Sequence, residues 1–480
     1  MDESYENCLL LQILPLFFGL CLRTVLSVYD YSGYKKPPIH GDFEAQRHWM
    51  EITTNLDIDQ WYKNGTDNNL EYWGLDYPPL TAYHSYLVGK IASFINNEWV
   101  KLNSSWGIET AGLKMFMRSS VLISDLLVFF PSIFIFSMTL RPKIRPLFLI
   151  IFLFSPPFIL IDHGHFQYNN MSLGLYTLSV YFLSNSKFSL SSVSFCLALL
   201  YKQMELYHAI PIFFYFLSKF LSMKHLGGIL NLTKVAFTVI STFTILLLPF
   251  LSSYDDIKSV FVRVFPLSRG LFEDKVSNFW CISNIFIKWR ELLPSDKLFQ
   301  LSTLLTLASC IPCCIVLLLK PTRNLFFYSS CIVGLNFFLF SFQVHEKTIL
   351  IPLLSAFINF SNEPDLAMWF SLVATMSIYP LMEKDGLVAP CLLLALIFLT
   401  LWYNEVRNDT AILSSKTLYA STFSFLLYLT IIVTTHKPPT KYPDLKALLI
   451  SALSFFHFSL FNVYYFIRML REYSSKVKSA

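Results

Sequence analysis

Long apolar segments recur along the whole chain and are separated by short polar joints. They cover residues 9–29, 116–140, 147–161, 235–251, 301–319, 325–342, 390–402, 421–434 and 447–467. A helix needs roughly 20 mostly apolar residues to cross a bilayer, so the shorter segments must be tilted, buried in protein or flanked by long polar side chains. With closely spaced pairs separated, the pattern predicts an all-α polytopic membrane protein with about fourteen transmembrane helices.

The composition supports a membrane protein and argues against two other classes. Of the 480 residues, 54% are hydrophobic and only 14% are charged, whereas soluble domains average about 25% charged residues. A large soluble all-α protein could not cover so many helices that are apolar on every side. The formal net charge of +5 is too small for a nucleic-acid-binding protein, which carries a strongly basic surface.

Basic residues are concentrated in alternate joints, which gives the chain an orientation. They are Arg141, Lys143, Arg145, Lys219, Lys224, Lys320 and Arg323 in the joints and Arg468, Arg471, Lys476 and Lys478 in the tail, 468–480. The positive-inside rule places these joints and the tail in the cytosol. Residues 1–7 are acidic, but an even number of crossings puts both ends on one side. We therefore predict two cytosolic termini, with 9–29 as an uncleaved signal anchor.

With the basic joints in the cytosol, the remaining polar loops are predicted to face the lumen. The long ones are 30–114 and 252–297, and the short joints 162–169, 202–208 and 343–347 fall on the same side. Loops are where polar residues ordinarily occur, but here the luminal ones mix acids, histidine, glutamine and tyrosine, whereas the cytosolic ones are plain basic linkers. We interpret residues 1–480 as one multi-spanning domain with its chemistry at the luminal face.

The end of the tail carries a candidate targeting signal. Lys478 and Lys476 lie three and five positions from the C-terminus. This spacing resembles the dilysine retrieval signal of endoplasmic-reticulum membrane proteins, which implies binding to coat machinery. Basic tails are common, and the signal gains weight because the tail is independently predicted to be cytosolic.

Cysteine and acidic residues give little indication of a metal or a disulfide framework. Most of the nine cysteines lie inside apolar segments. Cys310 and Cys313 have a ligand-like spacing but no histidine or acidic partner nearby, so we interpret them as packing residues. Asp42 and Glu44 form only a weak metal motif. We therefore predict no metal and no cofactor.

Asp42 is the candidate catalytic residue. It follows a glycine just before a segment with helical periodicity, close to Glu44 and Arg47. One interpretation is an N-cap, in which the carboxylate accepts backbone N–H groups. The other is a general base beside the membrane, because an inverting glycosyl transfer needs a carboxylate that takes a proton from the acceptor hydroxyl.

A second motif in the first loop suits sugar binding. It contains Glu71, Trp73, Asp76 and Tyr77, followed by two prolines that fix a rigid corner. Aromatic rings stack on the apolar face of a hexose while carboxylates hold its hydroxyl groups. An interfacial aromatic belt is the alternative, but a belt does not require two acids in the same run, so we favour substrate binding.

A third group of candidates lies at predicted luminal helix ends. It comprises His165, Gln167, Tyr168, Lys202, Gln203, Glu205, Arg269, Asp274, His345, Glu346 and Lys347. Arginine and lysine in this group could bind the phosphate of a membrane-embedded substrate. Snorkelling at the interface explains most of them singly. The run His345–Lys347 is harder to explain in that way, because three ionisable residues abut an apolar segment.

These motifs, in this order, resemble a known enzyme family. The matching stretches are GDFEAQRHWMEIT (41–53), EYWGLDYPPLTAYHS (71–85), DHGHFQYNN (162–170), YKQMELYH (201–208), FPLSRGLFEDKVSNFWC (265–281) and FQVHEKTILIP (342–352). They are similar to stretches of the endoplasmic-reticulum glucosyltransferases that use dolichyl-phosphate-glucose. The family has two branches, which add the first and the second glucose, and these forms look like the first branch.

The resemblance implies a fold, a reaction and a base. The fold is that of the C superfamily of glycosyltransferases, with a large first luminal loop. The reaction transfers glucose, with inversion, from dolichyl-phosphate-glucose to the terminal mannose of the nine-mannose lipid-linked oligosaccharide, making an α-1,3 bond without a metal. Asp42 matches the family's first-loop aspartate base, and we infer that His345 contacts the donor phosphate. The resemblance also implies that the protein is surrounded by membrane lipid and has no nucleic-acid partner.

Two alternatives stay open at this stage. The second-glucose branch of the same family differs in its acceptor. A lipid or sugar transporter would carry ionisable residues at mid-membrane and interrupted helices in paired halves. The charges of this chain cluster instead at predicted luminal helix ends, which favours chemistry at a surface over passage through the membrane.

Overall fold

The computed structural model describes residues 3–223, 225–265, 271, 275–407 and 438–478. Every regular element within these ranges is helical, which confirms the all-α prediction. Two of the candidate substrate-binding residues, Arg269 and Asp274, lie outside the described residues, as does the predicted apolar segment 421–434.

The described helices run in chain order from α1 to α23. The first half of the chain contains α1 (Glu3–Leu26), α2 (Asp42–Asn55), η1 (Ile58–Gln60), α3 (Leu70–Trp73), α4 (Pro79–Ile95), η2 (Asn97–Trp99), α5 (Ala111–Ser124), η3 (Asp125–Phe129), α6 (Phe130–Ser137), α7 (Arg145–Leu153), α8 (Pro156–Ile159), η4 (Leu160–Phe166), α9 (Asn169–Ser184), α10 (Phe188–Tyr201), η5 (Gln203–His208) and α11 (Ala209–Leu221). The second half contains α12 (His225–Leu247), η6 (Leu248–Phe250), α13 (Tyr254–Val264), α14 (Phe279–Ser283), α15 (Trp289–Leu292), α16 (Ser295–Leu319), α17 (Arg323–Phe340), η7 (Glu346–Ile349), α18 (Leu350–Ile358), α19 (Pro364–Ser377), α20 (Tyr379–Lys384), α21 (Val388–Arg407) and α23 (Leu445–Lys478). Elements η3 and η4 are π-helical turns, and the other η elements are 3-10 turns.

Six helices in the described ranges are long and apolar enough to cross a membrane, judged by length and composition alone. They are Ala111–Ser137, Leu226–Phe250, Ser295–Leu319, Arg323–Phe340, Val388–Glu405 and Leu445–Lys476. A seventh arises if Arg145–Leu153 and Pro156–Phe166, which are bent by 51° at their break, form one span. Several membrane-crossing helices are thus confirmed, whereas the finer count of about fourteen is not.

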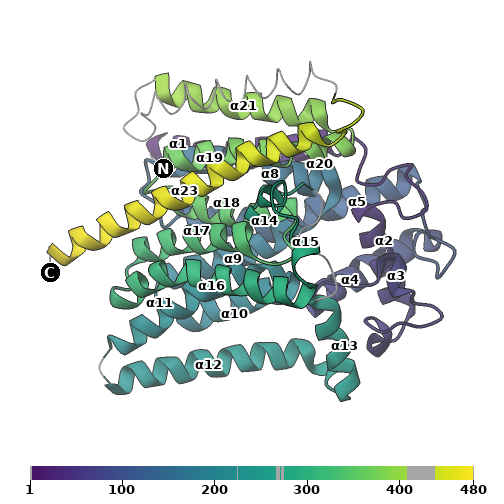
Figure 1. Ribbon diagram of the computed structural model, residues 1–480, viewed down its shortest axis with the longest axis horizontal. Helices are drawn as coiled ribbons and strands as arrows, with labels where there is room; N and C mark the ends of the chain where they lie inside the picture. The colour runs from purple at the N-terminus through teal and green to yellow at the C-terminus, as the bar shows by residue number, and fades with distance from the viewer. Residues whose placement is uncertain (1–2, 224, 266–270, 272–274, 408–437, 479–480) are drawn as a thin grey trace.

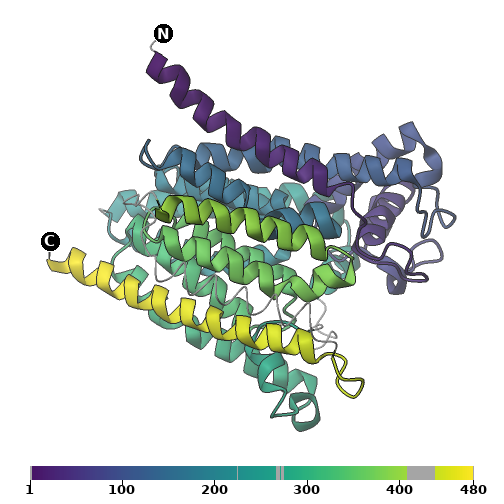
Figure 2. The ribbon, with the colours of Figure 1, turned by 90° about the horizontal axis from the view of Figure 1, so that it is seen from above.

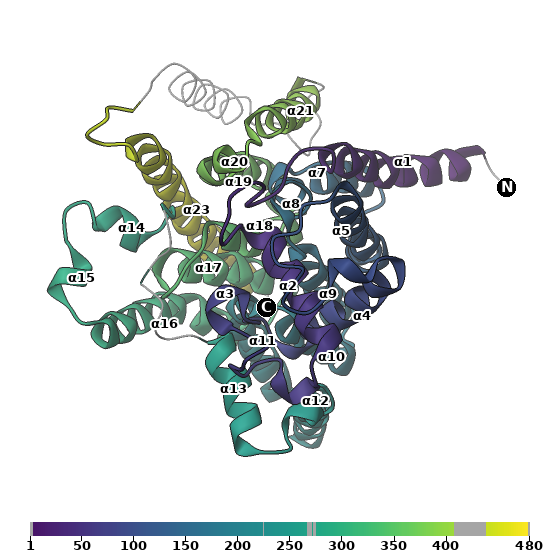
Figure 3. The ribbon, with the colours of Figure 1, turned by 90° about the vertical axis from the view of Figure 1, so that its right-hand side faces the viewer.

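The long helices form a bundle whose two ends differ. They run in roughly one direction, and the short helices α2 and α3 gather at one end (Figures 1 and 2). Figure 3, which faces that end, shows α2 and α3 in front of the bundle with α13 beside them. Helix α1 begins and α23 ends at the opposite end of the bundle. The first loop and the chain termini therefore lie at opposite ends.

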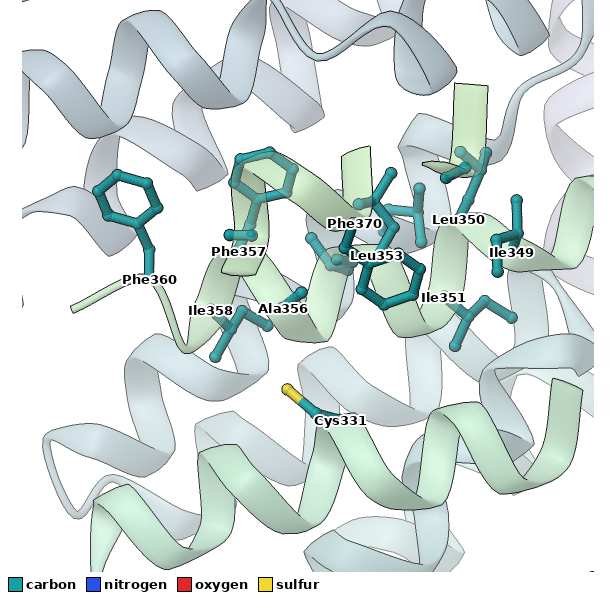
Figure 4. Packing of buried hydrophobic residues seen from close by; sticks show 14 of the residues in the cluster. Cys331, Ile349, Leu350, Ile351, Leu353, Ala356, Phe357, Ile358, Phe360 and Phe370 are labelled. Carbon is teal, nitrogen blue, oxygen red and sulfur yellow. The ribbon is translucent and has the colours of Figure 1, made fainter. Parts of the chain in front are cut away.

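Helices α17 and α18 form the centre of the bundle. In α17, 78% of the most apolar window is buried, whereas none of the window in Leu226–Phe250 is, so α17 is central and α12 is peripheral. Figure 4 shows Ala356 and Ile358 of α18 on the side that faces Cys331 of α17. All three side chains are buried. Close van der Waals packing of this kind holds helices together in lipid, where apolar burial alone gives no driving force.

Candidate active site

A cavity of about 520 Å³ opens where the first loop meets the bundle. Its polar lining includes Asp42, Asp76, Gln167, Lys202, Gln203, Glu205, His345 and Lys347, which come from α2, the following loop, and the turns before α9, α11 and α18. Its apolar lining includes Phe299 and Leu307 of α16 and Phe337 of α17. The cavity thus joins ionisable side chains to apolar membrane helices.

Asp42 is the first residue of α2, and the backbone around it is tightly constrained. The N-cap is Gly41, with φ −156°, and no side chain caps the helix, so the interpretation of Asp42 as an N-cap is wrong. A Cβ at Gly41 would lie 2.7 Å from the carbonyl carbon of Ser32, so only glycine allows this approach. The backbone N–H of Asp42 donates to Ser32 Oγ over 3.3 Å.

Three side chains converge on one oxygen of the Asp42 carboxylate. His165 Nε2 lies 2.9 Å from Asp42 Oδ2, and Gln167 Nε2 donates to the same oxygen over 2.5 Å. The ammonium of Lys347 also donates to Oδ2. Among the described residues, no side chain donates to Oδ1. The three side chains therefore all bind the same carboxylate oxygen, Oδ2.

The charges around Asp42 keep it ionised. Burial by itself would raise the pKa of the Asp42 carboxyl, but Lys347 and His165 outweigh burial and hold this pKa well below its usual range. The side chains of Asp42 and Lys347 remain 19% and 13% exposed, which is enough to present them to the cavity. A carboxylate that is ionised at neutral pH can accept a proton.

A π-helical turn brings His165 and Gln167 to the same carboxylate. Element η4 ends at Phe166, whose φ of 92° is rare for a residue with a side chain. Gln167 then turns to extended backbone with φ −153°. Strain of this kind costs about 1–3 kcal/mol and persists where surrounding structure imposes it. Phe166 is fully buried against the ring of Phe43, 4.8 Å away.

Lys202 is the second cation of the cavity. Its ammonium donates to the side-chain oxygen of Asn169 and lies 4.8 Å from the centre of the Tyr77 ring. Burial, followed by repulsion from Lys347, lowers the pKa of Lys202 to about 8. Nearby acids offset only part of the repulsion between the two lysines. The cavity is therefore suited to an anion.

The second motif of the first loop forms part of the cavity wall. Trp73, Asp76 and Tyr77 line it. Gln203 Nε2 donates to the carbonyl of Asp76 over 3.1 Å, and Arg263 of α13 donates to the carbonyl of Gly74 over 2.8 Å. The motif is therefore fixed from both η5 and α13.

Several other predicted site residues lie away from the cavity lining. Arg47 Nη2 forms ion pairs with Glu44 Oε1 at 2.6 Å and with Glu51 Oε2 at 2.8 Å, and all three side chains are at most 3% exposed. Glu71 is exposed, Tyr168 is buried with its hydroxyl 2.6 Å from Ser120 Oγ, and Glu346 is buried beside His345. None of the five predicted residues Glu44, Arg47, Glu71, Tyr168 and Glu346 lines the cavity.

Sequence reasoning missed Asp385, which contacts the site through His165. Its Oδ2 lies 2.5 Å from His165 Nδ1, and both side chains are at most 5% exposed. Asp385 stands in a short joint between α20 and α21, next to Gly386. An acid between two apolar segments was a usable signal, because acids were among the residue types that marked the joints predicted to be luminal.

The described part of the chain contains no group of three or more His, Cys, Asp or Glu side chains placed to hold a metal ion. The chemistry that the cavity offers from its own residues is proton acceptance at Asp42 and charge stabilisation by Lys202 and Lys347. An anionic group held by the lysines would lie within reach of the apolar lining contributed by α16 and α17.

The described helices and the cavity are those of a protein with several apolar, membrane-length helices and a pocket lined by a carboxylate and two lysines. Residues 19–464 match the model of the ALG6, ALG8 glycosyltransferase family. The chain is 41% identical over 476 residues to a Rattus norvegicus protein named dolichyl pyrophosphate Man9GlcNAc2 alpha-1,3-glucosyltransferase, covering 93% of this chain and 94% of that protein. It is also 41% identical to a Gallus gallus protein of the same name, covering 96% of each. A Drosophila melanogaster protein, named as a probable enzyme of this kind, is 40% identical, covering 96% of this chain and 98% of that protein.

The chain therefore belongs to the ALG6, ALG8 glycosyltransferase family. The resemblance found from the motifs is confirmed, as is the expectation of a glycosyltransferase with several membrane-crossing helices.

Proposed function

We propose that this protein transfers glucose, with inversion, from dolichyl-phosphate-glucose to the terminal mannose of the nine-mannose dolichyl-diphosphate oligosaccharide, forming an α-1,3 bond. The names of its relatives state the acceptor and the linkage. The observation that carries the proposal is the Asp42 carboxylate, which lines the cavity with Oδ2 engaged by three donors and Oδ1 left open.

In the proposed reaction, the acceptor hydroxyl oxygen attacks the anomeric carbon of glucose as the bond from that carbon to the phosphate oxygen breaks. The hydroxyl proton passes to Oδ1 of Asp42, and the electron pair of the broken bond leaves with dolichyl phosphate. General-base assistance of this kind contributes about 10²- to 10⁴-fold to the rate. Phosphate is already a competent leaving group, and lysine stabilises the charge that develops on it.

The donor has a phosphate and a polyprenyl chain, and each of these suits a different part of the cavity lining. Lys202, Lys347 and His345 supply cationic or donor groups for the phosphate. Phe299 and Phe337 extend the apolar lining toward the membrane helices, which suits a polyprenyl chain. For the acceptor, the rings of Trp73 and Tyr77 and the carboxylate of Asp76 offer stacking and hydroxyl binding. The substrate-binding roles predicted for the residues away from the lining stay proposals of the same kind.

We further propose that the site faces the lumen of the endoplasmic reticulum and that both termini are cytosolic. The basic joints and tail support this orientation. So does the arrangement of the bundle, because α1 begins and α23 ends opposite α2 (Figure 2). Helix α23 continues to Lys478, and we propose that Lys476 and Lys478 act as the retrieval signal bound by coat machinery.

The proposed acceptor is tested by product formation from defined substrates. Purified protein is given dolichyl-phosphate-glucose with either the nine-mannose acceptor or its mono-glucosylated form. We expect kcat/KM for the nine-mannose acceptor to be at least about tenfold higher, because a site shaped for one terminal sugar leaves polar groups unpaired with another. The reverse preference would assign the second-glucose reaction. Movement of the donor lipid across vesicles without a glucosylated product would assign a transporter.

The Lys202 ammonium makes donor binding depend on pH. Because the pKa of Lys202 is lowered to about 8, we expect kcat/KM for the donor to be highest below this pH and to fall as pH rises through it, since only the charged form attracts phosphate. Initial rates between pH 6 and pH 9.5 measure this. In Lys202→Arg the guanidinium stays charged, so its kcat/KM should not fall in the same range. An identical fall in that variant would contradict the role of Lys202.

A further inference from the structure

Asp385 connects the joint between α20 and α21 to the catalytic carboxylate through a single imidazole. His165 Nδ1 lies 2.5 Å from Asp385 Oδ2, and His165 Nε2 lies 2.9 Å from Asp42 Oδ2. The side chains of His165 and Asp385 are 4% and 5% exposed, respectively. Two carboxylates from distant parts of the chain therefore flank one buried ring.

The hydrogen bonds at the two ring nitrogens indicate the protonation state of His165. A neutral imidazole has one donor nitrogen and one acceptor nitrogen, so it can donate to only one of two carboxylates. The imidazolium donates to both. Lys347 Nζ lies 3.4 Å from His165 Nε2 and adds a positive charge on the Asp42 side. The Asp385 carboxylate supplies the opposing negative charge, which favours the imidazolium.

The backbone on both sides fixes Asp385 and His165 in these places. Asp385 is the C-cap of α20, and Gly386 follows with φ 73°, the left-handed conformation that closes a helix. The N–H of Leu387 donates to the carbonyl of Met382 over 2.8 Å. On the other side, a Cβ at Gly164 would lie 3.0 Å from Leu387 Cδ1, so a glycine lets η4 approach the joint closely.

Arg118 of α5 holds the same turn from a third direction. Its guanidinium donates to the carbonyl of His163 over 2.5 Å and to the carbonyl of Gly164 over 2.8 Å. The ring of His165 is therefore held by a backbone that is tied to α5 and by a side chain that is tied to α20. Little freedom remains for it to turn away from Asp42.

We propose that Asp385 is a positioning residue for glucosyl transfer, which holds His165 so that its Nε2–H fixes Oδ2 of Asp42 and leaves Oδ1 directed at the acceptor hydroxyl. This inference rests on the proposed function, because it assumes that Asp42 is the base. Asp385 acts on the reaction through His165 and does not line the cavity.

The alternative role of Asp385 is purely structural, as a tie between η4 and the joint. The two roles predict different kinetics. A positioning residue changes kcat with little effect on KM for donor or acceptor, because it acts on the orientation of the base. Its effect also disappears when His165 is already changed, since residues that act as a unit are not additive. A structural tie lowers the amount of folded protein and adds to the effect of a His165 substitution.

The experiment measures kcat and KM for Asp385→Asn, His165→Gln and the double variant in the full-length purified protein. We expect Asp385→Asn to lower kcat at least about tenfold with KM within about twofold, and the double variant to be no slower than His165→Gln alone. Asp385→Glu keeps the charge and is expected to recover part of kcat. Glu383→Gln is the matched control, because Glu383 is 45% exposed and pairs with Lys446 at 2.6 Å; its kcat should equal that of the unaltered protein.

The outcomes separate this inference from the function on which it rests. A normal kcat in Asp385→Asn beside an inactive Asp42→Asn, or additive losses in the double variant, would overturn the role of Asp385 alone. No glucose transfer by the unaltered protein would overturn the proposed function and this inference together. If Asp385→Asn does not fold, as judged by size-exclusion chromatography, Asp385→Ser is measured against Asp385→Glu, and equal kcat values in these two would overturn the role of the charge.

Discussion

Replacing Asp42 with asparagine is expected to lower kcat for glucose transfer by at least about 10²-fold, because an amide cannot take the proton of the acceptor hydroxyl. Asparagine matches the carboxylate in shape and still accepts hydrogen bonds through one oxygen. We therefore expect the variant to fold, to enter the membrane and still to bind the donor. Initial rates with dolichyl-phosphate-glucose and the nine-mannose acceptor measure the effect.

A matched control separates loss of the base from a general effect of removing an acid in the first loop. Glu98 is 65% exposed and forms only a surface pair with Lys101 at 3.4 Å, and such pairs contribute little to stability. Glu98→Gln should therefore keep the kcat of the unaltered protein. Turnover within about threefold of normal in Asp42→Asn would rule out proton abstraction by Asp42, since general-base catalysis contributes at least about 10²-fold.

The helical architecture was predictable because apolar segments of near-spanning length leave few alternatives to helices. The number of crossings was not. Residues 147–161 were counted as an ordinary span, but the prolines at 156 and 157 break the segment into two helices bent by 51°. A proline removes a backbone donor and bends a helix, and apolar length alone cannot show whether such a break makes one span or a re-entrant segment.

The candidate site was predictable at the level of motifs but not of individual roles. Asp42 was chosen in the first loop, and Gln167 and Lys347 at helix ends predicted to lie on the same side, and the fold brings all three together. Glu44 and Arg47 were chosen for their nearness in sequence to Asp42. On a helix, however, residues three positions apart share a face, and here they pair with each other away from the cavity.

The contact between His165 and Asp385 spans 220 positions of the chain, and no local pattern encodes it. It depends on the π-helical geometry of η4 and on the positive φ of Phe166. Turns of this kind appear at functional sites because surrounding packing holds them against their intrinsic preference. Sequence periodicity describes the preferred conformation, so it fails at the positions where the site departs from it.

The pKa of Asp42 poses a question for its role as a base. Lys347 and His165 hold this pKa well below the usual range of a carboxyl, and a strongly stabilised carboxylate is a weak base. Lys347 is also the cation nearest to Asp42 and lines the cavity in which the donor phosphate would lie. In the proposed reaction, a bound phosphate would compete with Asp42 for the same ammonium. Donor binding would therefore weaken the hold of Lys347 on Asp42 and make the base stronger as the acceptor arrives.

Lys347→Met is expected to lower kcat/KM for the donor by about 10- to 10²-fold, because it removes a charge-assisted hydrogen bond worth roughly 1.5–3 kcal/mol from the phosphate. It should also change the pH profile. Asp42 is active only when ionised, so its contribution is lost as pH falls through its pKa. In the unaltered protein this pKa is held well below the usual range of a carboxyl, so the acid fall in kcat/KM should lie below pH 4.5, the lower end of the measured range.

Without the Lys347 charge, burial is opposed by His165 alone among the nearest charges, so the pKa of Asp42 rises and the acid fall moves to higher pH. Rates between pH 4.5 and pH 8 would detect it. Lys347→Arg keeps a positive charge and serves as the control, with an acid limb like that of the unaltered protein. A Met variant that loses donor affinity but keeps the original acid limb would mean that Lys347 serves the phosphate without tuning Asp42. If the Lys347 ammonium serves both Asp42 and the donor phosphate, the loss of donor affinity and the shift of the acid fall to higher pH must occur in the same variant.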